Sequence, residues 1–201
     1  MAAPFQEVLD FWFGPALDET AIPKEKREMW FKNGPDYDDI IKDKFLALHN
    51  KASNGELDRW ARRGKSCLAL VLLLDQFSRH IYRRQAQSFS QDMQAIKHVK
   101  NAIASATDQE LLLIERTFLY MPLMHAEDVK TQEFSIKMFS KLVQEAPLSQ
   151  KPTYQATLSF AESHHYVIEK FGRFPELNEI LGRESTSLEE SFLATGKYRF
   201  L

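Results

Sequence analysis

Apolar residues recur at spacings of three and four along most of the 201-residue chain, which is the period of a helix with one buried side. No segment alternates apolar and polar residues as a half-buried strand does. The pattern predicts helices over residues 4–13, 24–32, 36–54, 65–82, 88–105, 107–121, 127–145, 152–171 and 186–195. We therefore expect an all-α fold of eight or nine antiparallel helices joined by short loops.

Residues that begin and end helices support these boundaries. Gly172 follows a long amphipathic stretch and is typical of a helix end. Two pairs have the spacing of a capping box, Thr107 with Glu110 and Thr186 with Glu189. We expect a helix to begin at each pair.

The segment LALVLLLDQFSRHIY predicts the most deeply buried helix of the protein. Residues 68–74 are apolar on every side, so the helix over about 65–82 should lie at the centre of the fold. In the helix before it, Ile40, Phe45 and Leu48 are expected to face the core.

Polar residues follow directly on that apolar run. Asp75 and Arg79 are four apart and share a helix face, as do Gln76 and His80. A buried charge needs a partner, so one interpretation is a structural ion pair between Asp75 and Arg79. The alternative is that this polar end lines a pocket, and the sequence leaves both open.

The stretch MPLMHAEDVKTQEFS holds a second polar set. On a helix, His125, Asp128, Gln132 and Ser135 fall on one face, while Glu127 points elsewhere. These residues are candidates for a site, although a helix start rich in acids is also common on a solvated surface.

The stretch SHHYVIEKFGRFPELNEILGRES holds a third set. Phe160 and His164 share the expected apolar face of one helix, so His164 is either a core histidine or a ligand-facing one. The chain then stops, turns and starts another helix. Arg173, Asn178 and Arg183 lie in this connector, and its turns require neither arginine, so both arginines are candidates for anion binding.

Composition narrows the class of protein. A chain of 201 residues fits one domain over 1–201, and the net charge of −2 gives no general attraction to nucleic acid or anionic lipid. The longest apolar run, residues 67–74, is too short to span a bilayer, and the N-terminus does not resemble a signal peptide. The single cysteine, Cys67, cannot form an internal disulfide. We expect a soluble cytoplasmic protein that binds neither nucleic acid nor membrane.

Several catalytic motifs are excluded. RRGKS at residues 62–66 resembles the end of a phosphate-binding loop, but Arg59 occupies the place of the first glycine and no strand precedes it. The chain has no zinc-binding cysteine cluster, no HExxH and no dinucleotide-binding glycine pattern. We expect no metal and no cofactor.

Five blocks of the sequence resemble a known family: VLDFWFG, the WF at residues 30–31, LALVLLLDQFSRHIYR, FLYMPLMHAED and FGRFPELNEILGREST. They are similar to domain-of-unknown-function family 924, found largely in bacteria. The resemblance implies an all-α fold similar to tetratricopeptide-repeat (TPR-like) proteins and no established activity. The family's recurrent polar residues match Asp75, Gln76, Arg79, His125, Glu127, Gln132, His164, Arg173, Asn178, Gly182 and Arg183.

The chain departs from the family pattern at two places. The family usually reads DQFPRN where this chain has Ser78 and His80, and FGRFPHRN where it has Glu176 and Leu177. A site shared with the family would therefore rest on Asp75, Arg79, His125, His164 and Arg173.

Three functions follow from these observations. The first is a helical binding scaffold for a peptide, a protein or a small anionic ligand, bound by Arg79, Arg173, Gln76, Gln132, Asn178 and Arg183. The second is a hydrolase- or lyase-type enzyme with His125 or His164 as acid/base, Asp75 or Glu127 orienting the histidine, and an arginine holding the substrate. The third is an assembly protein without a ligand. The sequence does not indicate an oligomeric state.

Overall fold

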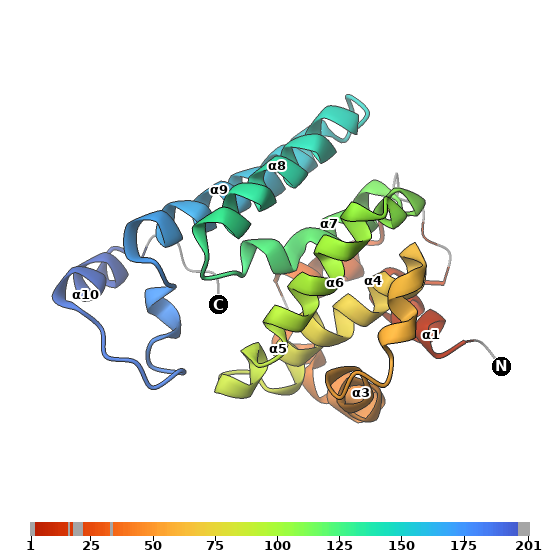
Figure 1. The fold of residues 1–201 in the computed structure, drawn as a ribbon, viewed down its shortest axis with the longest axis horizontal. Coiled ribbons are helices and arrows are strands. Elements are labelled where there is room, and N and C mark those ends of the chain that lie inside the picture. The colour runs from red at the N-terminus through yellow and green to blue at the C-terminus, as the bar shows by residue number, and fades with distance from the viewer. Residues whose placement is uncertain (1–2, 16, 18–21, 33, 197–201) are drawn as a thin grey trace. The chain divides into compact units, whose positions relative to one another are not determined.

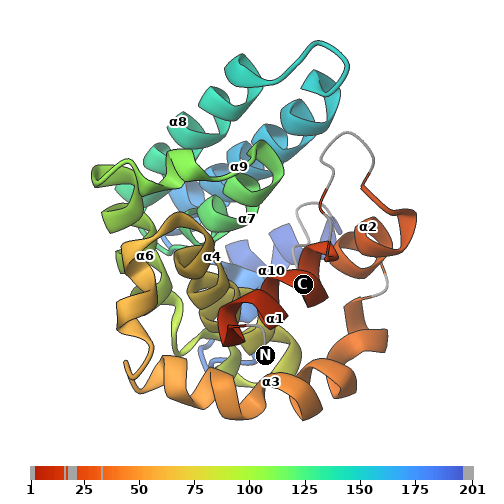
Figure 2. The ribbon, with the colours of Figure 1, turned by 90° about the vertical axis from the view of Figure 1, so that its right-hand side faces the viewer.

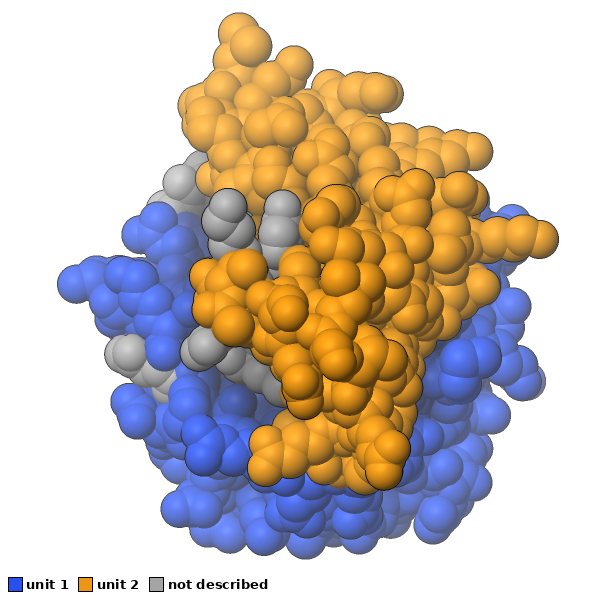
Figure 3. All heavy atoms as spheres, turned by 90° about the vertical axis from the view of Figure 1, so that its left-hand side faces the viewer, with its two compact units in different colours: residues 1–122 blue, residues 123–201 orange. Residues whose placement is uncertain are grey.

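The computed structural model describes residues 3–15, 17, 22–32 and 34–196, and every regular element within these ranges is helical. This confirms the all-α prediction. The chain divides into two compact units, residues 1–122 (unit 1) and residues 123–201 (unit 2), coloured blue and orange in Figure 3. The prediction of one domain over 1–201 and the TPR-like arrangement stay predictions.

In unit 1 the apolar run forms the buried helix that the sequence predicts. Helix α4 (Gly64–Leu72) passes without a break into a π-helical segment, η3 (Leu73–Phe77), and then into α5 (Ser78–Ile81). Every side chain from residue 68 to residue 74 is fully buried. α1 (Pro4–Phe13) and α6 (Asp92–Ala104) pack on α4, and α3 (Asp38–Ser53) packs on η3 and α5 (Figure 1).

Large rings fill the core of unit 1. Trp12 of α1 is in ring contact with Trp30 of α2 (Lys24–Phe31), with Phe77 of η3 and with Phe118 of α7 (Leu113–Met124). Aromatic pairs add to the free energy of area burial. These contacts bring α1, α2 and α7 together.

The predicted face of α3 was wrong by one position. Ile41 and Phe45 are buried one turn apart, whereas Ile40 is 48% exposed and Leu48 is only partly buried. The buried side also carries His49, which a hydrophobic pattern does not identify.

The predicted capping box at Thr107 is also wrong. Residues Thr107–Glu110 form a short 3-10 helix, η5, and α7 begins only at Leu113. The Glu110 carboxylate instead accepts a hydrogen bond of 2.8 Å from the backbone N–H of Gly64 and so caps the start of α4. The RRGKS sequence thus places a helix start against one of the chain's own carboxylates.

Gly64 is required for this close approach. A Cβ at position 64 would lie 2.6 Å from the carbonyl oxygen of Thr107 and 2.9 Å from Cβ of Glu110. Three further 3-10 segments, η1 (Gly34–Tyr37), η2 (Asp58–Arg62) and η4 (Ala86–Phe89), connect the helices of unit 1.

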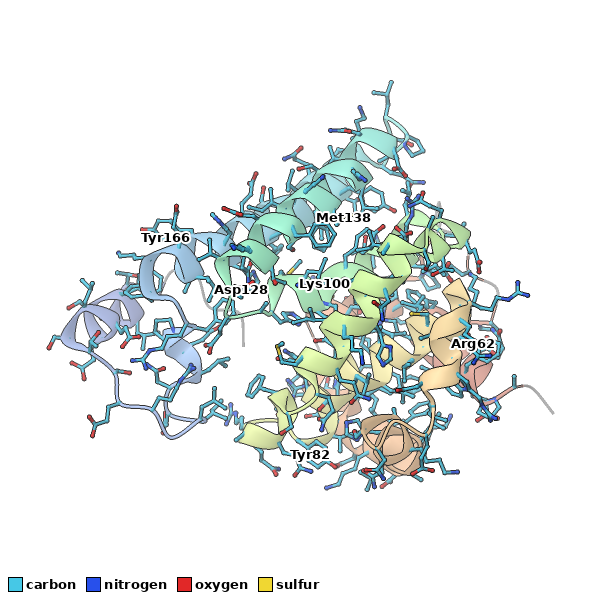
Figure 4. All side chains as sticks on the ribbon, viewed as in Figure 1. Arg62, Tyr82, Lys100, Asp128, Met138 and Tyr166 are labelled. Atoms are coloured by element: carbon cyan, nitrogen blue, oxygen red, sulfur yellow. The ribbon has the colours of Figure 1, made fainter. Side chains whose placement is uncertain are left out.

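Unit 2 is an antiparallel helix pair followed by a connector and one short helix. α8 (Val129–Glu145) and α9 (Lys151–Phe171) pack along their length, as Figures 1 and 2 both show. Asp128 caps the start of α8 by accepting a hydrogen bond of 2.8 Å from the N–H of Thr131 (Figure 4). Gly172 ends α9 in the left-handed conformation, as predicted.

The connector contains η6 (Pro175–Leu177) and leads to α10 (Ser187–Ala194). The capping box of Thr186 and Glu189 is present at the start of α10 and confirms that prediction. No helix within the described ranges is both long and apolar enough to cross a membrane.

We predict that Gly64→Ala lowers the free energy of unfolding by about 1–3 kcal/mol, the usual cost of forcing atoms into a packed site. The loss should appear although alanine favours helix more than glycine does. Chemical denaturation followed by circular dichroism measures it. Gly34→Ala is the matched control, because its new Cβ would meet nothing nearer than 3.5 Å. Equal losses in the two variants would contradict the close approach at Gly64.

Buried histidines should make unit 1 sensitive to acid. Burial lowers the pKa of His49 and of His98 below the ordinary 6.5, and Asp58 raises that of His98 only in part. Below pH 6.5 the unfolded chain takes up protons that the folded chain does not, so the free energy of unfolding should fall as the pH falls.

The expected slope is at most about 1.4 kcal/mol per pH unit for each histidine. Denaturation of the wild type and of His49→Phe between about pH 7.5 and pH 5.5, on either side of the ordinary histidine pKa, measures the share of His49. The phenylalanine keeps a ring beside Tyr82, which His49 contacts at a centroid distance of 5.4 Å. If the free energy of unfolding of His49→Phe depends on pH as that of the wild type does, the pKa of His49 is the same in the folded and unfolded states.

Candidate functional site

Arg79 lies between two carboxylates of unit 1. Its Nη1 is 2.8 Å from Oδ1 of Asp75, and its Nη1 and Nη2 each lie 2.9 Å from an oxygen of Asp92 at the start of α6. The Asp75 side chain is 1% exposed and that of Asp92 is 18% exposed. The two carboxylates raise the pKa of Arg79 against the effect of burial, so the guanidinium stays charged.

Asp75 and Gln76 both lie in the π-helical segment. Gln76 Nε2 donates a hydrogen bond of 2.6 Å to Oδ2 of Asp75, so Gln76 joins the same network. Single π-helical turns occur often at functional sites, but they also occur where side chains must be re-aimed inside a long helix. Here the polar atoms that the sequence singled out bind one another, and the structural ion pair is the interpretation that the geometry supports.

The candidates in unit 2 lie in one chain of contacts. The rings of His125 and His164 lie with their centroids 6.1 Å apart, and the ring of His164 contacts that of Phe174 at 5.6 Å. Nδ1 of His164 is 2.7 Å from the carbonyl oxygen of Phe160. Because a carbonyl can only accept, Nδ1 carries the proton in the neutral ring.

Gln132 fixes the backbone around His125. Its Nε2 donates to the carbonyl oxygens of Met124 and Ala126 at 2.6 Å and 2.8 Å. Gln132 and His164 are equally far from the turn between α8 and α9, so they lie at the same level of the antiparallel pair. We call His125, Gln132, Ser135, His164 and Phe174 the histidine cluster.

Two buried polar atoms of the histidine cluster make no hydrogen bond within the described part of the chain. They are Oε1 of Gln132 and Oγ of Ser135, one turn apart on α8. Ala161 lies at the level of Ser135 on α9 and has no polar side-chain atom to offer. Leaving a buried polar group unsatisfied costs about 1–3 kcal/mol, so each such atom needs an explanation.

Glu127 ties the connector to the start of α8. It accepts a hydrogen bond of 2.7 Å from the backbone N–H of Phe174 and binds both Nη atoms of Arg183 at 2.6 Å and 2.9 Å. Nε of Arg183 donates to Oδ1 of Asn178 at 3.0 Å. These contacts hold Phe174 against His164, so Glu127, Asn178 and Arg183 position the cluster.

Arg173 is paired with Glu189 of the capping box. Its Nε and Nη2 lie 2.7 Å and 2.8 Å from the two carboxylate oxygens, and Nη2 also donates to the carbonyl oxygen of Glu184. The Arg173 guanidinium lowers the pKa of Glu189 to about 2. The sequence pointed to Arg173 as an anion-binding residue, whereas the geometry makes it a link between the connector and α10.

Phe160 does not share the buried side of His164 as expected. Its side chain is 58% exposed, while His164 is buried. Within the described ranges, no three His, Cys, Asp or Glu side chains are grouped so that they could hold a metal ion.

The sequence gave no sign of the partners that His80 finds in unit 1. Nδ1 of His80 lies 2.7 Å from Oδ1 of Asp38, and Arg83 binds the same carboxylate through Nε at 2.5 Å and Nη2 at 2.7 Å. Asp38 begins α3, far from His80 in sequence, so no spacing rule links the two. The same holds for Asp92 and Arg79.

Comparison with known proteins supports the resemblance found in the sequence. The family model described as "Bacterial protein of unknown function (DUF924)" matches residues 8–197. The chain belongs to this family. The chain is also similar to a solved structure of a protein of unknown function, ATU0120 from Agrobacterium tumefaciens, at 33% identity and a TM-score of 0.79. That likeness covers 96% of this chain and 97% of the other.

A comparison with curated proteins finds no match. Membership of the DUF924 family therefore supports the fold, but it brings no activity. A function has to be inferred from the contacts of the histidine cluster and of the arginines themselves.

We predict that Arg79→Met lowers the free energy of unfolding by about 3–5 kcal/mol, because it leaves the buried carboxylate of Asp75 without its cation. Asp92→Asn should cost less, since Asp92 is partly exposed and Arg79 keeps Asp75. Chemical denaturation of the single variants and of Asp75→Asn with Arg79→Met gives the coupling between the two residues. We expect the double variant to lose less than the sum of the single variants. Additive losses would mean that the two side chains are solvated separately.

Proposed function

We propose that the protein is a helical binding protein whose ligand site is the histidine cluster of unit 2. The observation that carries the proposal is the pair of buried atoms that lack a hydrogen bond among the described residues, Oε1 of Gln132 and Oγ of Ser135. The rings of His125 and His164 are in contact in the same unit. A ligand that reaches these atoms would recover the free energy that their burial costs.

The chemistry of the cluster favours a ligand that donates hydrogen bonds. Oε1 of Gln132 can only accept, so its partner must be an N–H or an O–H. The arginines expected to hold an anion are already bound to carboxylates, Arg173 to Glu189 and Arg183 to Glu127. Of the peptide and small anionic ligands expected from the sequence, we favour a peptide or another amide-bearing ligand.

A cytoplasmic location is part of this proposal. It is supported by the single cysteine, which is buried in α4 as a free thiol. Burial raises the pKa of Cys67 to about 12, so the thiol is a poor nucleophile and serves only in packing.

An enzyme that uses a histidine with a carboxylate and an arginine is the second candidate. Asp38, His80 and Arg83 supply that combination in unit 1, in place of the residues that the sequence suggested. This observation favours acid–base chemistry there and is independent of the histidine cluster.

We expect N-methylacetamide and glycinamide to bind at the histidine cluster. Titrations of isotope-labelled protein should shift the ring signals of His125 and His164 in a saturable way, while acetate and inorganic phosphate should not. Ser135→Ala removes one of the two oxygens without adding bulk. It should weaken binding by about 2–10-fold, the value of one hydrogen bond.

Arg79→Met is the matched control for general destabilisation, because it lies outside unit 2. No shift with any of these probes would overturn the proposed site. Shifts with phosphate but not with the amides would keep the site and replace the amide by an anion that bears an O–H group. Shifts with acetate alone would overturn the site, because acetate has no proton to donate.

A further inference from the structure

Asp38 holds the imidazole of His80 in one orientation. Oδ1 of Asp38 lies 2.7 Å from Nδ1 of His80, and Arg83 binds both carboxylate oxygens. The His80 side chain is 8% exposed. A carboxylate fixed by an arginine cannot turn away, so both the position and the tilt of the imidazole are set before any ligand arrives.

The contact with Asp38 also decides which ring nitrogen carries the proton. An ionised carboxylate only accepts, so Nδ1 must donate. Arg83 Nη2 lies 3.2 Å from the same Nδ1, but two donors cannot share a hydrogen bond, so this approach is only a contact. Burial lowers the pKa of His80, which keeps the ring neutral near pH 7. Nε2 therefore presents a lone pair, and it makes no hydrogen bond to any described residue.

A buried donor lies beside this acceptor. The Trp12 side chain is fully buried, and its Nε1 makes no hydrogen bond within the ranges that the structure describes. The rings of Trp12 and His80 are in edge contact, with centroids 5.9 Å apart and planes at 77°. An oxygen that accepts one hydrogen bond and donates another, each of about 2.9 Å at a tetrahedral angle, joins nitrogens that lie about 4.7 Å apart. Polar edges of two rings in contact are close enough for one oxygen to join them.

Gly34 of η1 lies close to the imidazole of His80. A Cβ at this position would lie 3.5 Å from Cε1 of His80, the ring carbon between the two nitrogens. Because glycine has no side chain, only backbone atoms of η1 approach this carbon.

We propose that Trp12 and His80 form a binding site for one hydroxyl group, of a water molecule or of a small alcohol. The hydroxyl oxygen accepts from Nε1–H of Trp12, and its proton is donated to Nε2 of His80. A single O–H satisfies both groups, whereas a carbonyl satisfies only the indole and an anion would leave Nε2 facing negative charge.

The same geometry makes His80 a proton acceptor for the bound hydroxyl. If the proton moves to Nε2, the imidazolium keeps its Nδ1–H on Asp38 and the oxygen keeps the hydrogen bond from Trp12. A base oriented by a third group is the arrangement that activates hydroxyl nucleophiles in enzymes. The site lies wholly in unit 1 and does not depend on the histidine cluster.

The test is nuclear magnetic resonance of protein labelled with ¹⁵N on histidine and tryptophan. We expect the His80 ring to show the Nδ1–H form at about pH 7.5, above the ordinary histidine pKa. The indole proton of Trp12 should show a cross-peak to bound water. Ethanol should displace the water and shift both signals saturably. Acetone, which has no O–H, should leave the His80 signal in place.

His80→Asn removes the imidazole, and Asp38→Asn removes the carboxylate that orients it. Trp12→Phe removes the indole N–H. We expect His80→Asn to weaken ethanol binding at least several-fold, and Asp38→Asn to raise the fraction of the Nε2–H form of His80. If the ring shows Nε2–H in the wild type, or if ethanol shifts neither signal, the proposal is wrong. It is equally wrong if ethanol binds His80→Asn as well as the wild type. Because His80→Asn keeps a polar side chain of smaller size, the test remains decisive even if Trp12→Phe fails to fold.

Discussion

The pairing of arginine with carboxylate is the interaction on which the rest of the structure depends. Taking a charge out of water costs several kcal/mol unless an opposite charge and hydrogen bonds replace the solvent. In unit 1, Arg79 joins η3 to the start of α6 through Asp92, and Arg83 joins the end of α5 to the start of α3 through Asp38. In unit 2, Arg183 binds Glu127 in the same two-pronged way. Each pair links segments that are distant in sequence to the start of a helix.

The helices themselves could be predicted because their causes are local. The apolar run at 68–74 has no polar side, so only a buried position satisfies it. Gly172 adopts a left-handed conformation that favours glycine, and Thr186 caps α10 through a residue three positions away. The capping box at Thr107 failed because its glutamate has a distant competitor, the N–H of Gly64, which no local rule contains.

The site was harder to predict because its partners are distant in sequence. The polar residues were identified correctly as unusual, but their roles depend on what faces them. Spacing on one helix linked Asp75 to Arg79, yet it gave no indication of Asp92. Arg173 looked available for a ligand because the turns of the connector do not require it, and Glu189, its actual partner, was identified only as part of a cap. His80 stood out only for sharing a helix face with Gln76 and for departing from the family pattern, and Asp38, which gives it a defined proton, lies at the start of another helix.

The saturation of the arginines has a consequence for recognition. A guanidinium that already binds both oxygens of a carboxylate has few N–H donors left for a second anion. The carboxylate beside it also repels that anion. The two proposed sites consist instead of neutral groups, an amide and a hydroxyl in unit 2, and an indole and an imidazole in unit 1. Neutral hydrogen-bonding groups bind a ligand well only if its donors and acceptors point in the matching directions. They therefore discriminate between ligands more strictly than a single charge does. In the proposed sites the ion pairs would therefore act on binding indirectly. They fix the positions of the neutral groups, and they leave no free guanidinium in these networks to bind an anion.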